Sequence, residues 1–295
     1  SRRLSAYRSD FRPSKQKHSN KHFNSLTADM VRKFYEIIRP ESSSKPNPIN
    51  PFPTGEIQFR NYLICRLLLN YGLRVSELLL LEKNSIKPNI KGVQFSIIVT
   101  SVDDDVRDPR KRLPSLKNSW AHRVLALDIN DYNHLKTYID KIRKKTSHSF
   151  IFTSTKNNTP PLSYHSIYDI FSKIDCAFKK EYPQFSDEES IDSVVSITPH
   201  VARHTWAYLI LKRVYTDKYQ SVMRSCQLAG VDFAIAGLMS EAKDELRLLG
   251  GWSHNSRMPE LYARRFLSER ANFSNLTRIA ADASEDDFFS SIHQA

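Results

Sequence analysis

The spacing of apolar residues is the feature that most constrains the fold of this chain. In most segments these residues recur every three to four positions, as on one face of an amphipathic helix. Thr27, Ser163 and Thr198 stand where such segments begin and are the expected N-caps. One stretch, residues 92–102, alternates instead, and residues 123–127 would pair with it as a hairpin. The pattern predicts a mostly α-helical fold with one small antiparallel β-sheet (α+β).

Length and composition bound the class of protein. A chain of 295 residues suits one or two domains with a sizeable core. Hydrophobic residues make up 40% and charged residues 26%, which is typical of a globular protein. No apolar run approaches the roughly 20 residues that a membrane span needs, so no membrane partner is expected. The three cysteines lie far apart, which indicates reduced thiols in a cytosolic protein and disfavours structural zinc.

The charge balance points to a polyanionic partner. Lys and Arg total 44 against 32 Asp and Glu, a formal net charge of +12. Half of this charge lies in residues 1–22, which would be either a solvated linker or a basic arm that follows phosphates. Charge alone does not choose between DNA, RNA and an acidic membrane surface.

Three short segments carry residues suited to chemistry. The first is Gly-Leu-Arg-Val-Ser-Glu-Leu at residues 72–78, and the second is His-Val-Ala-Arg-His-Thr at residues 200–205. The third is Leu-Gly-Gly-Trp at residues 249–252, followed by Tyr262. Taken singly, each has an ordinary structural explanation, such as a helix-capping arginine, a surface His/Arg pair or core aromatic residues. A Gly-rich phosphate loop and a carboxylate pair suited to two magnesium ions are both lacking in the sequence.

In this order, the three segments resemble the tyrosine recombinase (phage integrase) family over roughly residues 26–266. The resemblance implies that family's catalytic-domain fold over residues 23–281. It implies a site-specific recombinase or integrase of a mobile element, which cleaves and rejoins double-stranded DNA through a 3′-phosphotyrosyl intermediate and a Holliday junction. It also implies a homotetramer on a specific DNA site, accessory DNA-bending proteins, a bacterial cytoplasmic location at the nucleoid, and no cofactor or metal.

The resemblance assigns roles to the residues of these segments. Tyr262 would be the nucleophile that holds the phosphate covalently. Arg74 and Arg203 would hold the transition-state phosphate, since each offers a planar donor fork that stays charged. His200 would donate a hydrogen bond to the site or act as general base toward the tyrosine, and Trp252 would give an indole N–H to the phosphate.

Other roles are open between two residues. A lysine of the hairpin connection would protonate the leaving 5′ oxygen, and Lys117 is preferred over Lys111. His254 is the alternative to Trp252, because Trp252 lies one position further from the tyrosine than is usual for the family. Glu77 would hold Arg74 in its orientation without contacting the phosphate itself. The fallback nucleophiles are Tyr208, Tyr215 and Tyr219.

The ends of the chain and one insertion complete the expected organisation. Residues 282–295 begin acidic and continue with two phenylalanines, which predicts a short helix with exposed apolar residues. The resemblance implies that this segment docks on a neighbouring subunit. An extra helix is expected around residues 218–239. The chain begins with serine, and the family usually carries a helical DNA-binding domain before the catalytic one, so a fragment of a longer protein is expected.

Two other functions are compatible with the same residues. A type IB topoisomerase shares the tyrosine and arginine chemistry but relaxes supercoils as a monomer, and the Arg-His-Thr context at residues 203–205 favours a recombinase. The other is a catalytically silent DNA-binding protein on this fold, against which the complete set of candidate catalytic residues argues.

Overall fold

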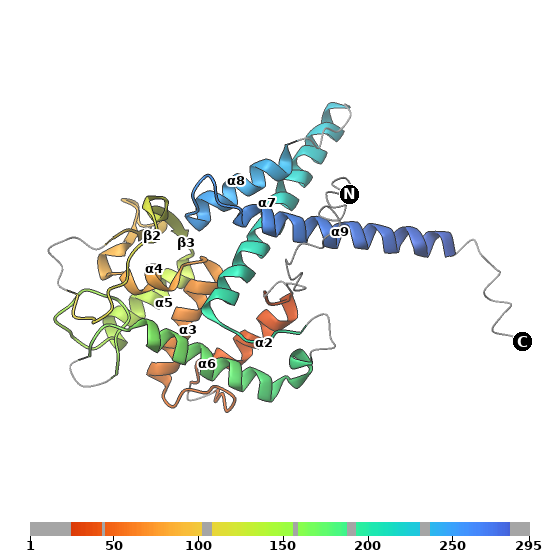
Figure 1. The fold of residues 1–295 in the computed structure, drawn as a ribbon. Coiled ribbons are helices and arrows are strands. Elements are labelled where there is room, and N and C mark those ends of the chain that lie inside the picture. The colour runs from red at the N-terminus through yellow and green to blue at the C-terminus, as the bar shows by residue number, and fades with distance from the viewer. Residues whose placement is uncertain are drawn as a thin grey trace, which may run out of the picture.

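A computed structural model describes residues 25–42, 45–101, 108–155, 159–187, 193–230 and 237–283. The described residues form helices and one three-stranded antiparallel sheet, which confirms the predicted fold class. The basic segment 1–22 and residues 284–295 of the expected tail lie outside the described residues. Figure 1 shows helices and sheet gathered in one body, from which the last helix extends. In chain order the helices and strands are α2 (Ala28–Ile38), α3 (Gly55–Asn70), α4 (Val75–Leu80), β1 (Ile86–Pro88), β2 (Phe95–Val99), β3 (Arg123–Leu127), α5 (Ile129–Thr137), α6 (Tyr164–Glu181), α7 (Pro199–Ala229), α8 (Leu238–Gly250) and α9 (Met258–Ala283).

Three helices begin where the sequence predicts. The side-chain hydroxyls of Thr27, Ser163 and Thr198 each accept a hydrogen bond from a backbone N–H in the first turn of α2, α6 and α7. Each bond satisfies one of the amide groups that a helix start leaves without a partner. Helix α7 also has proline as its first residue, where a missing N–H costs nothing.

The sheet has the strand order β1-β2-β3. Strands β2 and β3 form the predicted hairpin, and Phe95 pairs with Leu127 at one end and Val99 with Arg123 at the other. Strand β1 pairs with the other edge of β2 and was not predicted. Its three residues are too few to show alternation in the sequence.

The helix expected as an insertion in the C-terminal part is not a separate one. A separate inserted helix around residues 218–239 was expected, but residues 218–229 prolong α7 to 31 residues. After its first residue, α7 contains no proline or glycine that would end it earlier. Gly230 ends α7 in a left-handed conformation, with φ of +65°. Helix α8 begins after Gly237.

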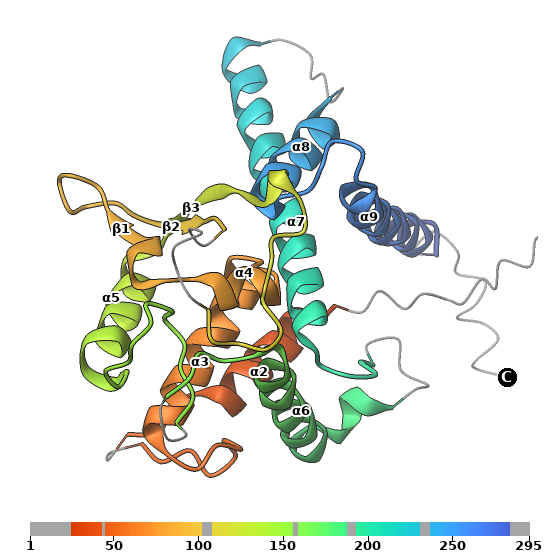
Figure 2. The same cartoon turned by 60° about the vertical axis from the view of Figure 1, so that its left-hand side comes forward.

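Two clusters of buried side chains form the core. The larger cluster includes Phe34, Ile64 and Phe171 and joins α2, α3, α4, α6 and the sheet. The smaller cluster includes Leu246 and Phe266 and lies between α7, α8 and α9. Helix α7 contributes to both, and Figure 2 shows it running from the α2, α3 and α6 part to the α8 and α9 pair. In the described part of the chain, no helix combines the length and apolar composition needed to cross a membrane.

Candidate active site

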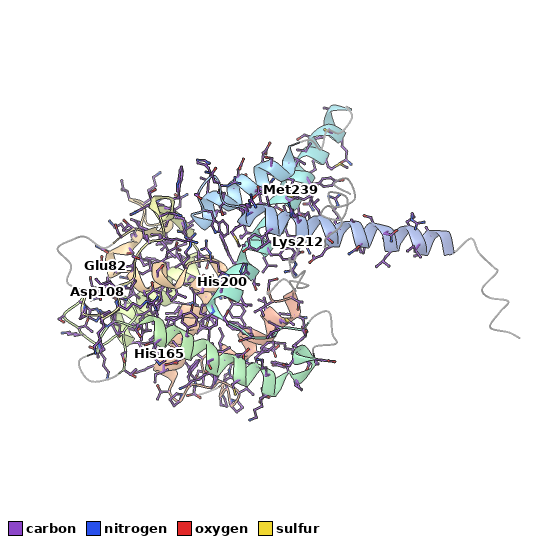
Figure 3. The ribbon with its side chains drawn as sticks, in the orientation of Figure 1. Glu82, Asp108, His165, His200, Lys212 and Met239 are labelled. Carbon is purple, nitrogen blue, oxygen red and sulfur yellow. The ribbon has the colours of Figure 1, made fainter. Side chains whose placement is uncertain are left out.

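An open cleft of about 350 Å³ lies beside the first turn of α7, between the two clusters of buried side chains that form the core. In Figure 3, His200 on this turn lies in the middle of the molecule, between the N-terminal helices and the α8 and α9 pair. No acidic side chain is among the described residues that line the cleft, so its walls suit an anion. The predicted site residues that line it are Arg74, Lys117, His200, Arg203, Trp252 and Tyr262.

Two of the alternative residues lie elsewhere. Lys111 is not among the residues that line the cleft. His254 is exposed, and its ring packs edge-on against Trp120 with ring centroids 4.5 Å apart. The structure therefore brings Lys117 and Trp252 into the cleft, and leaves their two competitors outside it.

Glu77 lies buried behind the cleft and joins three arginines. Arg74 donates to one carboxylate oxygen, and Arg123 donates to both oxygens at 3.1 and 2.9 Å. Arg203 lies 3.9 Å from the same carboxylate. Burial alone would raise the pKa of Glu77, but the hydrogen bond and charge of Arg123, with the charges of the other two arginines, lower it. Glu77 is therefore ionised at neutral pH and fixes the guanidinium groups in place.

The two arginines of the cleft also bind backbone carbonyls. Arg74 caps α4 and donates to the Gly251 carbonyl at 2.9 Å. Arg203 donates to the carbonyls of Gly72 and Gly250, the latter at 2.5 Å. Its guanidinium carbon lies 4.7 Å from the centre of a Trp252 ring. Burial and the charge of Arg74 lower the pKa of Arg203 to about 9, against the opposing effect of Glu77. These contacts tie the start of α4 to the glycine turn after α8.

Arg123 is a site residue that the sequence analysis missed. It was considered only as the first residue of the second hairpin strand. In the structure its guanidinium is buried, binds Glu77, and donates to the Leu249 carbonyl at 2.8 Å. The two partners of this ion pair lie 46 positions apart in the chain, so no local pattern links them.

Tyr262 lies in the second turn of α9 and is 3% exposed. Its hydroxyl oxygen is 2.5 Å from Nδ1 of His204, and Nε2 of His204 is 2.7 Å from Nε2 of His200. Burial raises the pKa of Tyr262 above its ordinary value near 10, although the charge of Arg203 opposes this. The sequence analysis assigned no role to His204, yet the spacing of four residues between the histidines places both on one face of a helix.

Both histidines are neutral at ordinary pH. Burial, the neighbouring His200 ring and Arg203 lower the pKa of His204 to about 4. Burial, Arg203 and Lys117 lower the pKa of His200. A neutral imidazole can accept a proton, so the arrangement can deprotonate the tyrosine.

The fallback tyrosines lie away from the cleft, along α7. Tyr208 donates to Glu269, and Tyr215 accepts a bond of 2.8 Å from Arg270. The ring of Tyr219 stacks on that of Tyr215. Among the described residues, no three His, Cys, Asp or Glu side chains gather as metal ligands would.

Comparisons with known proteins identify a family and a fold. The phage integrase family model matches residues 25–221. The chain is similar to the XerH site-specific recombinase bound to a palindromic difH substrate, with 17% identity and a TM-score of 0.51, over 88% of this chain and 56% of that one. It is similar to the Tn1549 transposon integrase bound to circular intermediate DNA, with 18% identity and a TM-score of 0.51, over 83% and 65% of the two chains.

The similarity to these two structures is a similarity of fold. This chain spans less than two thirds of the length of either structure. A comparison with curated protein sequences gives no significant match.

Proposed function

The chain belongs to the phage integrase family, and from that premise we propose that it is a site-specific DNA recombinase that uses Tyr262 to cleave and rejoin DNA. One observation carries the proposal. A tyrosine hydroxyl bound to an imidazole faces a cleft that also holds two arginines fixed by a buried carboxylate. The solved XerH and Tn1549 proteins of this fold were both bound to DNA, which supports double-stranded DNA as the partner.

The proposed reaction begins with attack of the Tyr262 oxygen on the scissile phosphorus. The bond from phosphorus to the 5′ oxygen breaks, which leaves a 3′-phosphotyrosyl link and a 5′-hydroxyl. The 5′-hydroxyl of a partner strand then attacks the phosphotyrosine and restores a phosphodiester. Two such exchanges through a Holliday junction would recombine two duplexes. Because each step exchanges one phosphodiester for another, the reaction needs no external energy source.

Arg74 and Arg203 would neutralise the charge that develops on the phosphate oxygens. Each guanidinium has five N–H groups, and its hydrogen bonds within the described part of the chain use two of them. The others can reach phosphate oxygens. Trp252 would add an indole N–H, and Lys117 would protonate the leaving 5′ oxygen. Glu77 would position the arginines without touching the DNA.

A homotetramer on the recombination site is the proposed assembly. Residues 267–281 of α9 are exposed, and Phe273, Leu276 and Ile279 recur there at every third position. Exposed apolar residues in a row on one helix favour contact with another subunit. The expected docking tail, residues 282–295, follows directly. A mobile-element role, accessory DNA-bending proteins and action at the bacterial nucleoid belong to the same proposal.

Plasmid assays distinguish this proposal from its two alternatives. Recombination sites would be selected from a pool of nicked duplexes with a randomised centre, by recovery of DNA that becomes covalently attached to the protein. We expect a plasmid with two selected sites to give recombinant circles, and a plasmid without sites to keep its supercoils. Relaxation of the site-free plasmid would instead show a type IB topoisomerase. A silent DNA-binding protein would change neither plasmid and attach to no duplex.

A further inference from the structure

The hydroxyl of Tyr262 contacts one histidine, and that histidine contacts a second one. His204 Nδ1 lies 2.5 Å from the tyrosine oxygen, and its Nε2 lies 2.7 Å from Nε2 of His200. The two imidazole rings are nearly perpendicular, with centroids 4.1 Å apart. His200 therefore lies behind His204 as seen from the tyrosine. We propose that His204 takes the proton from Tyr262 and passes a proton on to His200, which extends the proposed function above and rests on it.

The contacts are compatible with two proton orders, and the proposal uses the one in which the tyrosine is the first donor. Tyr262 donates its O–H to the unprotonated Nδ1 of His204. The Nε2–H of His204 then donates to the unprotonated Nε2 of His200, which carries its own proton on Nδ1. Both rings are neutral in this arrangement.

The proposed step balances as follows. A lone pair of the Tyr262 oxygen forms the bond to phosphorus while the bond to the 5′ oxygen breaks. The tyrosine proton moves to Nδ1 of His204, and the Nε2 proton of His204 moves to His200. His204 ends neutral in its other tautomer, and His200 ends as imidazolium. The leaving 5′ oxygen takes its proton from Lys117.

The positive charge ends on the imidazole that tolerates it better. His200 is the more exposed of the two rings, whereas His204 is partly buried beside Tyr262. Two charged groups bear on the pair: Arg203 on α7 acts on both histidines, and Lys117 from the hairpin connection acts on His200. The titratable hydroxyl of Tyr262 on α9 contacts His204. Water can solvate the imidazolium of His200, so moving the charge outward lowers the cost of forming it near Arg203.

The test measures the single-turnover rate of covalent attachment to a nicked duplex selected from the randomised pool. His204→Ala removes the imidazole, and His204→Asn keeps a hydrogen-bond acceptor near the place of Nδ1 but cannot hold a proton. We expect both variants to attach about 10²- to 10⁴-fold more slowly than wild type. We expect His200→Ala to be slowed less than His204→Ala. His165→Asn, at an exposed position on α6, is the matched control and should react as wild type does.

The pH profile separates proton transfer from positioning. Without a base, attachment must wait for tyrosinate, so the rates of both His204 variants should rise about tenfold per pH unit below the pKa of Tyr262. The wild-type rate should be level above about pH 7, because the pKa of His204 is about 4 and that of His200 lies below its ordinary value of 6.5. Equilibrium DNA binding by the variants should match wild type.

Three results would overturn the inference. A His204→Asn variant with the wild-type rate and profile would mean that His204 only positions the tyrosine. An unaffected His204→Ala variant would remove any role, and greater slowing by His200→Ala would make His200 the direct base. Failure of the proposed function looks different, since wild-type protein would then attach to no duplex, or Tyr262→Phe would attach as well.

Discussion

Glu77 is the residue on which the arginines of the cleft depend. Its side chain is fully buried, and three guanidinium groups surround its carboxylate. The sequence could predict the contact with Arg74, because the two lie three positions apart at a helix start. It could not predict Arg123 or Arg203 as partners, because those contacts depend on how the hairpin and α7 pack against α4.

We expect Glu77→Gln to lower the free energy of unfolding by about 3–5 kcal/mol, since it leaves buried guanidinium groups without their counter-charge. Urea unfolding measures this. Glu241→Gln, which removes an exposed partner of Lys218, is the control and should cost at most about 1 kcal/mol. Similar losses in both variants would show that the buried carboxylate contributes no more to the free energy of unfolding than an exposed one.

The same carboxylate predicts a pH dependence of stability. Its pKa is lower in the folded protein than the ordinary value of 4.5. Its stabilising contribution is therefore full above pH 4.5 and is lost as the pH falls through the folded-state pKa. Unfolding free energies measured over this range should decrease with falling pH more steeply for wild type than for Glu77→Gln. Parallel curves would contradict the lowered pKa.

Lys117 is the proposed general acid, and its removal should matter only when the leaving group needs a proton. Lys117→Ala should slow cleavage of a normal phosphodiester by about 10²-fold or more, and slow cleavage of a 5′-bridging phosphorothiolate far less, because a thiolate leaves unprotonated. Cleavage rates on the two substrates measure the difference, with Lys111→Ala as the matched control. Equal slowing on both substrates would exclude Lys117 as the acid.

At the scale of elements, local signals predicted where helices begin better than how far they continue. Thr27, Ser163 and Thr198 mark helix starts because a cap is a local hydrogen bond. The full lengths of α7 and α9 were not predicted, since the side chains of their outer turns are mostly exposed or half-buried and pack on little. Strand β1 escaped prediction because its pairing with β2 is tertiary.

The turn between α3 and α4 requires glycine for two separate reasons. Gly72 has φ of +60°, and a Cβ there would lie closer than 3.0 Å to the indole of Trp206. Gly92 has φ of +68° and open space around it. We expect Gly92→Ala to cost about 1–2 kcal/mol of unfolding free energy, and Gly72→Ala about 1–3 kcal/mol more. Thermal or urea unfolding compares the two variants. Equal costs would mean that the Trp206 indole can move away from the added Cβ without a loss of stability.

The exposed part of α9 should serve assembly rather than folding. We expect Phe273→Glu and Ile279→Glu to leave the fold and half-site binding intact while the synaptic complex is lost. Ser274→Glu, on the opposite side of this helix, should assemble normally. Sedimentation or gel shift on paired sites measures synapsis. Deletion of residues 282–295 should also lower synapsis sharply. If the two glutamate variants and the deletion variant all assembled normally, this end of the chain would be excluded as the subunit contact.

At the scale of the whole molecule, the cleft gathers residues from segments spread over most of the chain. Arg74 comes from the N-terminal half, Lys117 from the hairpin connection, and Tyr262 from the last helix. The order of these motifs predicted six residues as one site, and all six line the cleft: Arg74, Lys117, His200, Arg203, Trp252 and Tyr262. The contact between His204 and Tyr262 was not predictable, because it spans 58 positions and depends on how α9 packs against α7.

The most direct test of the account is to map the covalent link between protein and DNA. Wild-type protein is trapped on a nicked duplex, separated on a denaturing gel, digested, and analysed by mass spectrometry. The account predicts one adduct, a 3′-phosphate on the peptide that contains Tyr262, with a free 5′-hydroxyl on the released strand and no adduct from Tyr262→Phe. An adduct on Tyr208, Tyr215 or Tyr219, or one that persists in Tyr262→Phe, would contradict it.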